Sequence, residues 1–110
     1  MHMMLVYRVL LTSLPESKKA LLRQFCPLDF FRFSDEPNKH SVVIQNNGQF
    51  HAVAIIEETE DCVYWERFSV RTLSNYNVYA SEILKWLNEE NSRSKTIKVS
   101  LDISSISECI

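Results

Sequence analysis

Glycine is nearly absent from this chain, and its scarcity limits the possible functions more than any other feature of the sequence. Gly48 is the single glycine among 110 residues. Loops that cradle phosphate groups need several glycines within a few residues, because only a bare backbone can approach the ligand closely. The sequence therefore excludes a P-loop and a dinucleotide-binding fingerprint in their usual forms, and we predict no cofactor.

Composition and length are typical of one small globular domain. Hydrophobic residues make up 45% of the chain and charged residues 24%, close to the soluble average. We therefore expect a single domain over residues 1–110, with part of 1–3 a cloning remnant and 104–110 a loose tail. The formal net charge of −2 gives no electrostatic basis for gripping nucleic acid through its phosphates. No apolar run approaches the roughly 18 residues of a membrane span.

The cysteines favour a reducing compartment. The chain has three cysteines and no Cys-x-x-Cys pair, so the usual zinc-site spacings are absent. An odd number of cysteines without a secretory leader predicts free thiols and a cytoplasmic protein. Cys26 is predicted at a helix end and Cys62 beside acidic residues, and both settings disfavour a nucleophilic thiolate.

Hydrophobic periodicity predicts the element order β-α-β-β-β-β-α-β. Strands are expected over 4–12, 30–33 and 96–103, and a three-strand meander over 40–70. Helices are expected from Ser13 to about Cys26 and from Ser74 to about Glu90. We therefore predict the α+β class, with a mixed, mainly antiparallel sheet and two helices on one face.

The dipeptide Asn47-Gly48 is the strongest turn signal in the chain. An Asn-Gly pair suits the two positive-φ positions of a type I′ turn, so a hairpin tip is predicted here. An uninterrupted ladder then pairs Ile44 with His51 and puts Val42 on the same face as Val53. Both faces of this meander are apolar, whereas two helices on one side cover only one face. Either loops and the segment 30–33 cover the second face, or it is exposed and marks an interaction site.

No catalytic or metal-binding group can be assembled from the sequence. In the predicted ladder His40 and His51 lie four residues apart, about 13 Å, too far to share a metal ion. His51 is interpreted as a packed core or edge residue and His40 as a solvated loop residue. We predict no catalytic residues and no metal.

Acidic residues concentrate in the second half of the chain. Residues 51–110 hold six basic and ten acidic side chains, against six and four in residues 1–50. A cluster of carboxylates can steer a basic partner protein, and a tryptophan can anchor it. An alternative is that Trp65 belongs to the core and the acids only solvate a turn. The predicted partner-binding surface comprises Glu57, Glu58, Glu60, Asp61, Trp65, Arg67 and Trp86.

In size, layout and acidic second half, the chain resembles the class of small cytosolic inhibitors that neutralise toxins, among them immunity proteins. The resemblance implies a non-enzymatic protein-binding module whose partner is a protein with a basic surface. One alternative is a homo-oligomeric structural or adaptor domain, for which a homodimer is expected. Another is a small metal-independent nuclease or RNA-binding protein, for which His51, Arg67 and Tyr64 are the residues that could be combined. Membrane association is not expected.

Overall fold

The computed structural model describes residues 4–91 and 95–99 and contains one five-stranded sheet in the order β1-β2-β3-β4-β5. Neighbouring strands are antiparallel, except that β4 and β5 are parallel. This confirms the predicted α+β class and the mixed, mainly antiparallel sheet. The remnant predicted within 1–3, the strand end 100–103 and the tail 104–110 lie outside the described residues. The elements are β1 (Met4–Val9), η1 (Leu11–Ser13), α1 (Glu16–Arg23), α2 (Asp29–Phe33), β2 (Lys39–Asn46), β3 (Gln49–Glu58), β4 (Cys62–Val70), η2 (Leu73–Asn75), α3 (Tyr76–Glu90) and β5 (Thr96–Val99).

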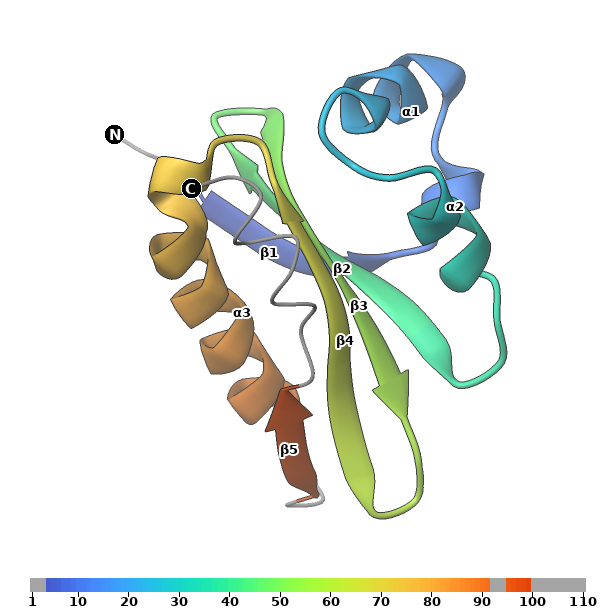
Figure 1. The fold of residues 1–110 in the computed structure, drawn as a ribbon, viewed down its shortest axis with the longest axis vertical. Helices are drawn as coiled ribbons and strands as arrows, with labels where there is room; N and C mark the ends of the chain where they lie inside the picture. Colours follow the sequence, from blue (N-terminus) through green and yellow to red (C-terminus); the bar gives the residue numbers. More distant parts are fainter. Residues whose placement is uncertain (1–3, 92–94, 100–110) are drawn as a thin grey trace.

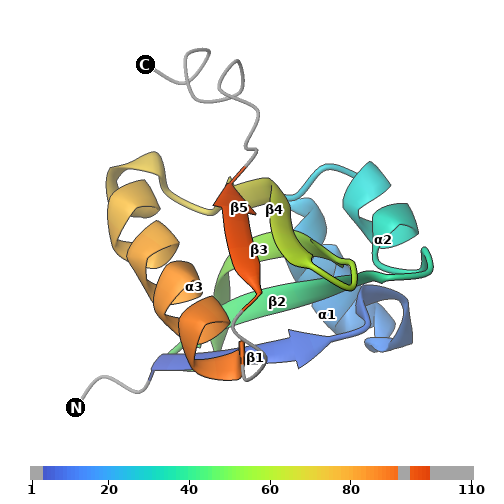
Figure 2. The same cartoon turned by 90° about the horizontal axis from the view of Figure 1, so that it is seen from below.

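Helices cover both faces of the sheet, whereas two helices on one face were predicted. Figures 1 and 2 show α3 on one side of the strands and α1 with α2 on the other. Each side has its own core, and the alternating residues of β2 and β3 point into one or the other. The α3 side buries Val42, Ile44, Ala52, Ala54, Ile56, Trp65, Tyr79, Ile83 and Leu87. The α1–α2 side buries Leu11, Leu22, Cys26, Phe30, Val43, Phe50, Val53 and Ile55.

This arrangement explains why both faces of the meander are apolar. Neither face is left open for a partner, because each meets a layer of helix. Among the residues that the structure describes, no helix is both long and apolar enough to cross a membrane.

The segment predicted as a second strand is the short helix α2. Phe30 and Phe33 are three residues apart, a spacing that puts both on one face of a helix. Phe30 is buried against the sheet, and Ser34 closes the helix by donating a hydrogen bond to the Phe31 carbonyl. The prediction was wrong because a short aromatic run suits a buried strand and a buried helix equally well.

The Asn47-Gly48 turn lies where it was predicted, with φ angles of 53° and 80°. The β2–β3 ladder departs from the prediction soon after the turn. Ile44 pairs with Ala52 instead of His51, because one extra residue enters β3 as a bulge. A shift of one residue reverses which side chains share a face, so Val53 joins the core opposite to that of Val42.

We expect Gly48→Val to lower the free energy of unfolding by about 1 kcal/mol or more. No atom lies within 4 Å of the place a Cβ would take, so the cost comes from the positive φ alone. Asn tolerates this backbone region, so Gly48→Asn should stay close to the wild type. Urea unfolding of the three proteins measures the difference, and equal midpoints for Val and Asn would contradict the assigned turn geometry.

Candidate functional site

A second bulge interrupts β4 and changes the direction of its side chains. Trp65 pairs with Ile56 and Arg67 pairs with Ile55, so Glu66 is the extra residue. Trp65 points into the core beneath α3, whereas Glu66 forms an ion pair with Lys39 of β2 and Arg67 one with Asp29 of α2. Bulges are frequent beside active sites, because they re-aim a side chain within a rigid sheet.

Around this bulge, charged side chains form a group that we call the α2-side cluster. The Lys39 amine lies 3.1 Å from a Glu66 carboxylate oxygen and 3.2 Å from one of Glu36. Arg67 lies 3.9 Å from Asp29. The cluster holds two basic and four acidic residues: Lys39, Arg67, Asp29, Glu36, Glu57 and Glu66.

Phe33 of α2 forms the apolar side of the α2-side cluster. The Lys39 amine is 4.8 Å and the Arg67 guanidinium carbon 4.9 Å from the centroid of its ring. Cations at this distance from an aromatic face are attracted to it. The two basic side chains are therefore held between the ring and the carboxylates, which orders the cluster.

Two carboxyl groups of the cluster share a hydrogen bond. The hydrogen bond to Glu66, together with burial, raises the pKa of Glu57. Burial acts to raise the pKa of Glu66 as well, but hydrogen bonds from Glu57 and Lys39 outweigh it and lower that pKa. As the pH falls, Glu57 is therefore the first of the pair to take up a proton, whereas Glu66 keeps its charge to lower pH.

At the far end of β4 the chain turns through residues 71–75 into α3. The Arg71 backbone N–H donates to the His51 carbonyl, and its Nε donates to the Phe50 carbonyl, both at 2.8 Å. Asn75, the residue before α3, makes no side-chain capping bond. The first N–H groups of an α-helix have no partner within the helix and carry partial positive charge. The Tyr76 N–H at this end donates to the Leu73 carbonyl of η2, so any attraction for an anion rests on the helix dipole and on the N–H groups that follow Tyr76.

A third feature is a cavity of about 150 Å³ between the sheet and the C-terminal end of α3, lined by Arg8, His40, Glu58, Val63, Trp86, Leu87, Glu90 and Asn91. Arg8 and His40 also line a neighbouring cavity of about 260 Å³ beside the end of β1. His40 is a half-buried residue of β2, so the prediction of a solvated loop histidine was wrong. Burial lowers the pKa of His40 to about 4, the Arg8 guanidinium adds to this effect, and Glu58 opposes it.

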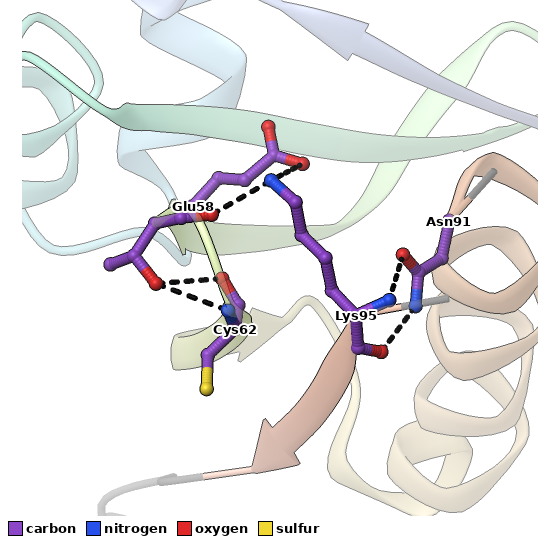
Figure 3. Close-up of polar contacts among 5 residues, drawn as sticks. Glu58, Cys62, Asn91 and Lys95 are labelled. Carbon is purple, nitrogen blue, oxygen red and sulfur yellow. Dashed lines mark hydrogen bonds and ion pairs between the residues drawn. The ribbon is translucent and has the colours of Figure 1, made fainter. Parts of the chain in front are cut away.

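Near this cavity, Lys95 contacts the end of β3, the turn that follows it and the residue after α3, as Figure 3 shows. The Lys95 amine lies 3.5 Å from the Glu58 carboxylate and donates to the Thr59 carbonyl at 2.7 Å. The Asn91 side chain bonds to both the N–H and the carbonyl of Lys95. The negative charge of Glu58 is thus balanced within the protein.

We expect the depressed pKa of His40 to make the fold acid-sensitive. Between about pH 6.5 and 4 the unfolded chain binds a proton at this histidine and the folded chain does not. Its contribution to stability is therefore complete above pH 6.5 and is lost as the pH falls, by about 2–3 kcal/mol at pH 4. His40→Gln should lose less stability than the wild type when urea unfolding is compared at pH 7 and 4.5. Carboxylates titrate in both proteins, so parallel losses would contradict the buried, neutral state of His40.

The seven residues predicted as one partner surface do not form a single patch. Trp65 is only 1% exposed, and its indole N–H donates to the Arg67 carbonyl, so Trp65 is a core residue. The remaining six are distributed over three places: Glu57 and Arg67 in the α2-side cluster, Glu58 and Trp86 at the cavity, and Glu60 and Asp61 exposed in the β3–β4 turn.

Sequence reasoning missed the residues that complete these sites, namely Arg8, Asp29, Lys39, His40 and Glu66. They come from four elements, β1, α2, β2 and β4, and no short motif links them. Within residues 4–91 and 95–99, no group of three His, Cys, Asp or Glu side chains is placed to hold a metal ion. Burial, reinforced by Asp29, raises the pKa of Cys26 to about 12, which disfavours its thiolate.

Comparison with known proteins gives the fold a context. No protein-family model and no curated protein sequence matches the chain. The ribosomal-protein-alanine N-acetyltransferase of Brucella melitensis biovar Abortus 2308 is similar in structure, with a TM-score of 0.62 and 13% identity over 91% of this chain and 81% of its own. The aminoglycoside N-acetyltransferase AAC(6')-Iy, solved in complex with CoA, has a TM-score of 0.54 and 14% identity over 99% and 84%.

These similarities show a shared fold, and they correct the function predicted from the sequence. Both proteins are enzymes, and nearly the whole chain superposes on each of them. This contradicts the prediction of a non-enzymatic, immunity-type inhibitor. The prediction failed because it was based on size, charge and the absence of motifs, none of which identifies a fold.

Proposed function

We propose that this protein is an N-acyltransferase that moves an acyl group, such as acetyl, from coenzyme A to an amine. The observation that carries the proposal is the structural match to two N-acetyltransferases over 91% and 99% of the chain. Two local features support it, one for each substrate: the end of β4 that leads into α3, and the α2-side cluster. We also propose a cytoplasmic location, since the described cysteines, Cys26 and Cys62, are free thiols.

The β4–α3 connection has donors that suit the diphosphate of coenzyme A. The N-terminus of α3 is not capped by Asn75, and anions bind readily at such helix ends. Thr72 and Ser74 are exposed there and add hydroxyl donors, and Arg71 adds a positive charge. In other proteins a glycine-rich loop binds phosphate through its backbone N–H groups. This connection contains no glycine, so its side chains and the helix N–H groups would bind the diphosphate together.

The α2-side cluster suits the amine. Its four acidic residues exceed its two basic ones, and Asp29 Oδ1 is buried without a hydrogen-bond partner among the described residues. A buried acceptor without a donor is costly, and an incoming ammonium group would satisfy it. Glu66 lies on β4, five residues before Arg71, which directly follows the strand; at about 3.3 Å per residue the separation is roughly 17 Å. The long pantetheine arm of coenzyme A is suited to such a separation.

The chemistry requires the amine to lose a proton. Bound acyl-coenzyme A would supply an activated acyl carbonyl: the amine nitrogen would bond to its carbon, the carbon–sulfur bond would break, and coenzyme A would leave as its thiol. The cluster attracts the ammonium form, and the Glu57–Glu66 pair accepts the proton that the amine must lose, as a general base. Phe33 and the ordered Lys39 and Arg67 side chains keep this pair in a fixed position.

A matched pair of substitutions tests the cofactor site. Ser74→Asp puts a negative charge at the start of α3, where it would repel a phosphate but stabilise the helix. Ser81→Asp puts the same charge on the exposed side of α3, two turns further along. We expect Ser74→Asp to weaken coenzyme A binding about tenfold, which corresponds to about 1.4 kcal/mol. Ser81→Asp should bind like the wild type in isothermal titration calorimetry.

Transfer is measured separately, by mass spectrometry of a panel of primary amines incubated with acetyl-coenzyme A. Acetylation of at least one amine, at a rate proportional to protein concentration, is the expected result. A wild-type protein that neither binds coenzyme A at millimolar concentration nor acetylates any amine would overturn the proposal. Equal losses in the two serine variants would place the cofactor elsewhere.

A further inference from the structure

We propose that the cavity beneath the C-terminal end of α3 binds a small zwitterion, a molecule of amino-acid size with one ammonium and one carboxylate group. The cavity lies at the end of α3 opposite to the β4–α3 connection, so this site is separate from the proposed cofactor site. Its volume of about 150 Å³ has room for several water molecules. Pockets for drug-sized ligands measure roughly 300–1,000 Å³, so only a small metabolite fits.

One wall of the cavity is positive. Arg8 of β1 forms no ion pair with any residue that the structure describes, although it lines the cavity. His40 of β2 lies next to it and can donate a hydrogen bond from its neutral ring. A guanidinium and an imidazole N–H side by side suit a carboxylate.

The opposite wall is negative. Glu90 is the last residue of α3 and has no ion pair within the described part of the chain. The C-terminal end of a helix carries partial negative charge, and the last turn of α3 contains no basic residue to offset it. A carboxylate at the negative end of a helix dipole attracts an ammonium group.

The remaining polar groups of the cavity already have partners. Lys95 balances Glu58, and the Asn91 side chain is occupied by the Lys95 backbone (Figure 3). Arg8 and Glu90, both exposed to solvent, are thus the two charged residues lining the cavity that form no ion pair with a described residue. Trp86, Leu87 and Val63 supply apolar surface beside them.

Opposite charges on two walls select against ligands that carry a single charge. A simple anion would be attracted by Arg8 and repelled by Glu90. A simple cation would be attracted by Glu90 and repelled by Arg8. A zwitterion satisfies both walls at once. The distance between Arg8 and Glu90 determines whether the ammonium and carboxylate of the ligand are attached to one carbon, as in an α-amino acid, or to the two ends of a longer chain. Two zwitterions that differ in this spacing distinguish the two cases.

The experiment is an NMR titration of the labelled protein, with the His40 ring and the Trp86 indole N–H as reporters. The probes are L-alanine, 4-aminobutyrate, sodium acetate and methylammonium chloride, at constant ionic strength and pH. We expect saturable shifts with one of the two zwitterions, with a Kd of about 1 mM. Acetate and methylammonium should produce no saturable shift.

Four variants link the binding to the two charges. Arg8→Gln and Glu90→Gln should each weaken binding about tenfold, whereas Glu89→Gln, a neighbouring charge that does not line the cavity, should leave it unchanged. Arg8→Lys should retain part of the affinity, which separates a charge effect from a local loss of structure. Saturable binding of acetate or methylammonium alone, no saturation with either zwitterion, or equal effects of Glu89→Gln and Glu90→Gln would overturn the proposal.

This test is independent of the proposed transferase function, because it contains no coenzyme A and measures binding alone. A protein that binds the zwitterion and acetylates no amine would keep this inference and overturn the other. A protein that acetylates an amine but binds neither zwitterion would keep the proposed transferase function and overturn this inference.

Discussion

Replacing Trp65 with alanine should lower the free energy of unfolding by about 3–5 kcal/mol, the usual cost of removing a buried aromatic side chain. Trp65 is among the largest side chains in the core and is almost fully shielded by β-strand and α3 residues. Its ring meets Phe68 edge-on, with 5.0 Å between the centroids. The substitution leaves a cavity and also removes the donor that bonds to the Arg67 carbonyl, which follows the β4 bulge.

Urea unfolding measured by far-UV circular dichroism, which does not depend on tryptophan, tests this prediction. Leu28→Ala is the control, because Leu28 is 71% exposed and its truncation should change stability by less than about 0.5 kcal/mol. A Trp65→Ala protein as stable as this control would mean that Trp65 lies at the surface. In that case the original interpretation of Trp65 as a partner-binding anchor would regain its basis.

Replacing Glu66 with glutamine should lower the rate of amine acylation by about 100-fold or more, the typical contribution of a general base. This prediction depends on the proposed transferase function. Glutamine keeps the size of the side chain and removes its charge, so the ion pair with Lys39 is lost while the bulge remains. Glu57→Gln should have a smaller effect, because the raised pKa makes Glu57 the first of the pair to take up a proton, and the amide of glutamine can still donate to Glu66.

Glu60→Gln is the matched control, since Glu60 is exposed in the β3–β4 turn away from the cluster. Its transfer rate should equal that of the wild type. The wild-type rate should also fall at low pH, as the carboxyl pair takes up its second proton, and this acid limb should disappear in Glu66→Gln. Equal rates for Glu66→Gln and Glu60→Gln, with both proteins folded, would remove Glu66 from the reaction.

The elements that sequence reasoning predicted well are those determined by local chemistry. The type I′ turn depends on two adjacent residues, Asn47 and Gly48, and formed as predicted. The helix predicted from Ser74 to about Glu90 corresponds to α3, whose apolar stripe includes the buried Tyr79, Ile83 and Leu87. In each case the deciding interactions lie within a few residues of one another.

The features that escaped prediction depend on packing between distant segments. The bulges at His51 and Glu66 add one residue to one strand of a pair, and no residue type marks their positions. Each bulge moves the side chains that follow it to the other face of the sheet. Residues such as Val53 were therefore predicted on a face that they do not occupy. The environment of His40 is likewise set by Arg8 and Glu58, which lie 32 and 18 positions away in the chain.

The placement of β2 and β3 at the centre of the sheet also determines how the molecule opens. Each of these strands has a strand on both sides and helices above and below, so its amide groups exchange with solvent only when the whole domain unfolds. The described part of β5 pairs with β4 through four residues, three of which are exposed. It joins β4 only after the chain has crossed over through α3, a contact that costs more loop-closure entropy than a hairpin. The resistance of this protein to transient opening should therefore decrease from the middle of the sheet outwards, with the described part of β5 among the first segments to detach.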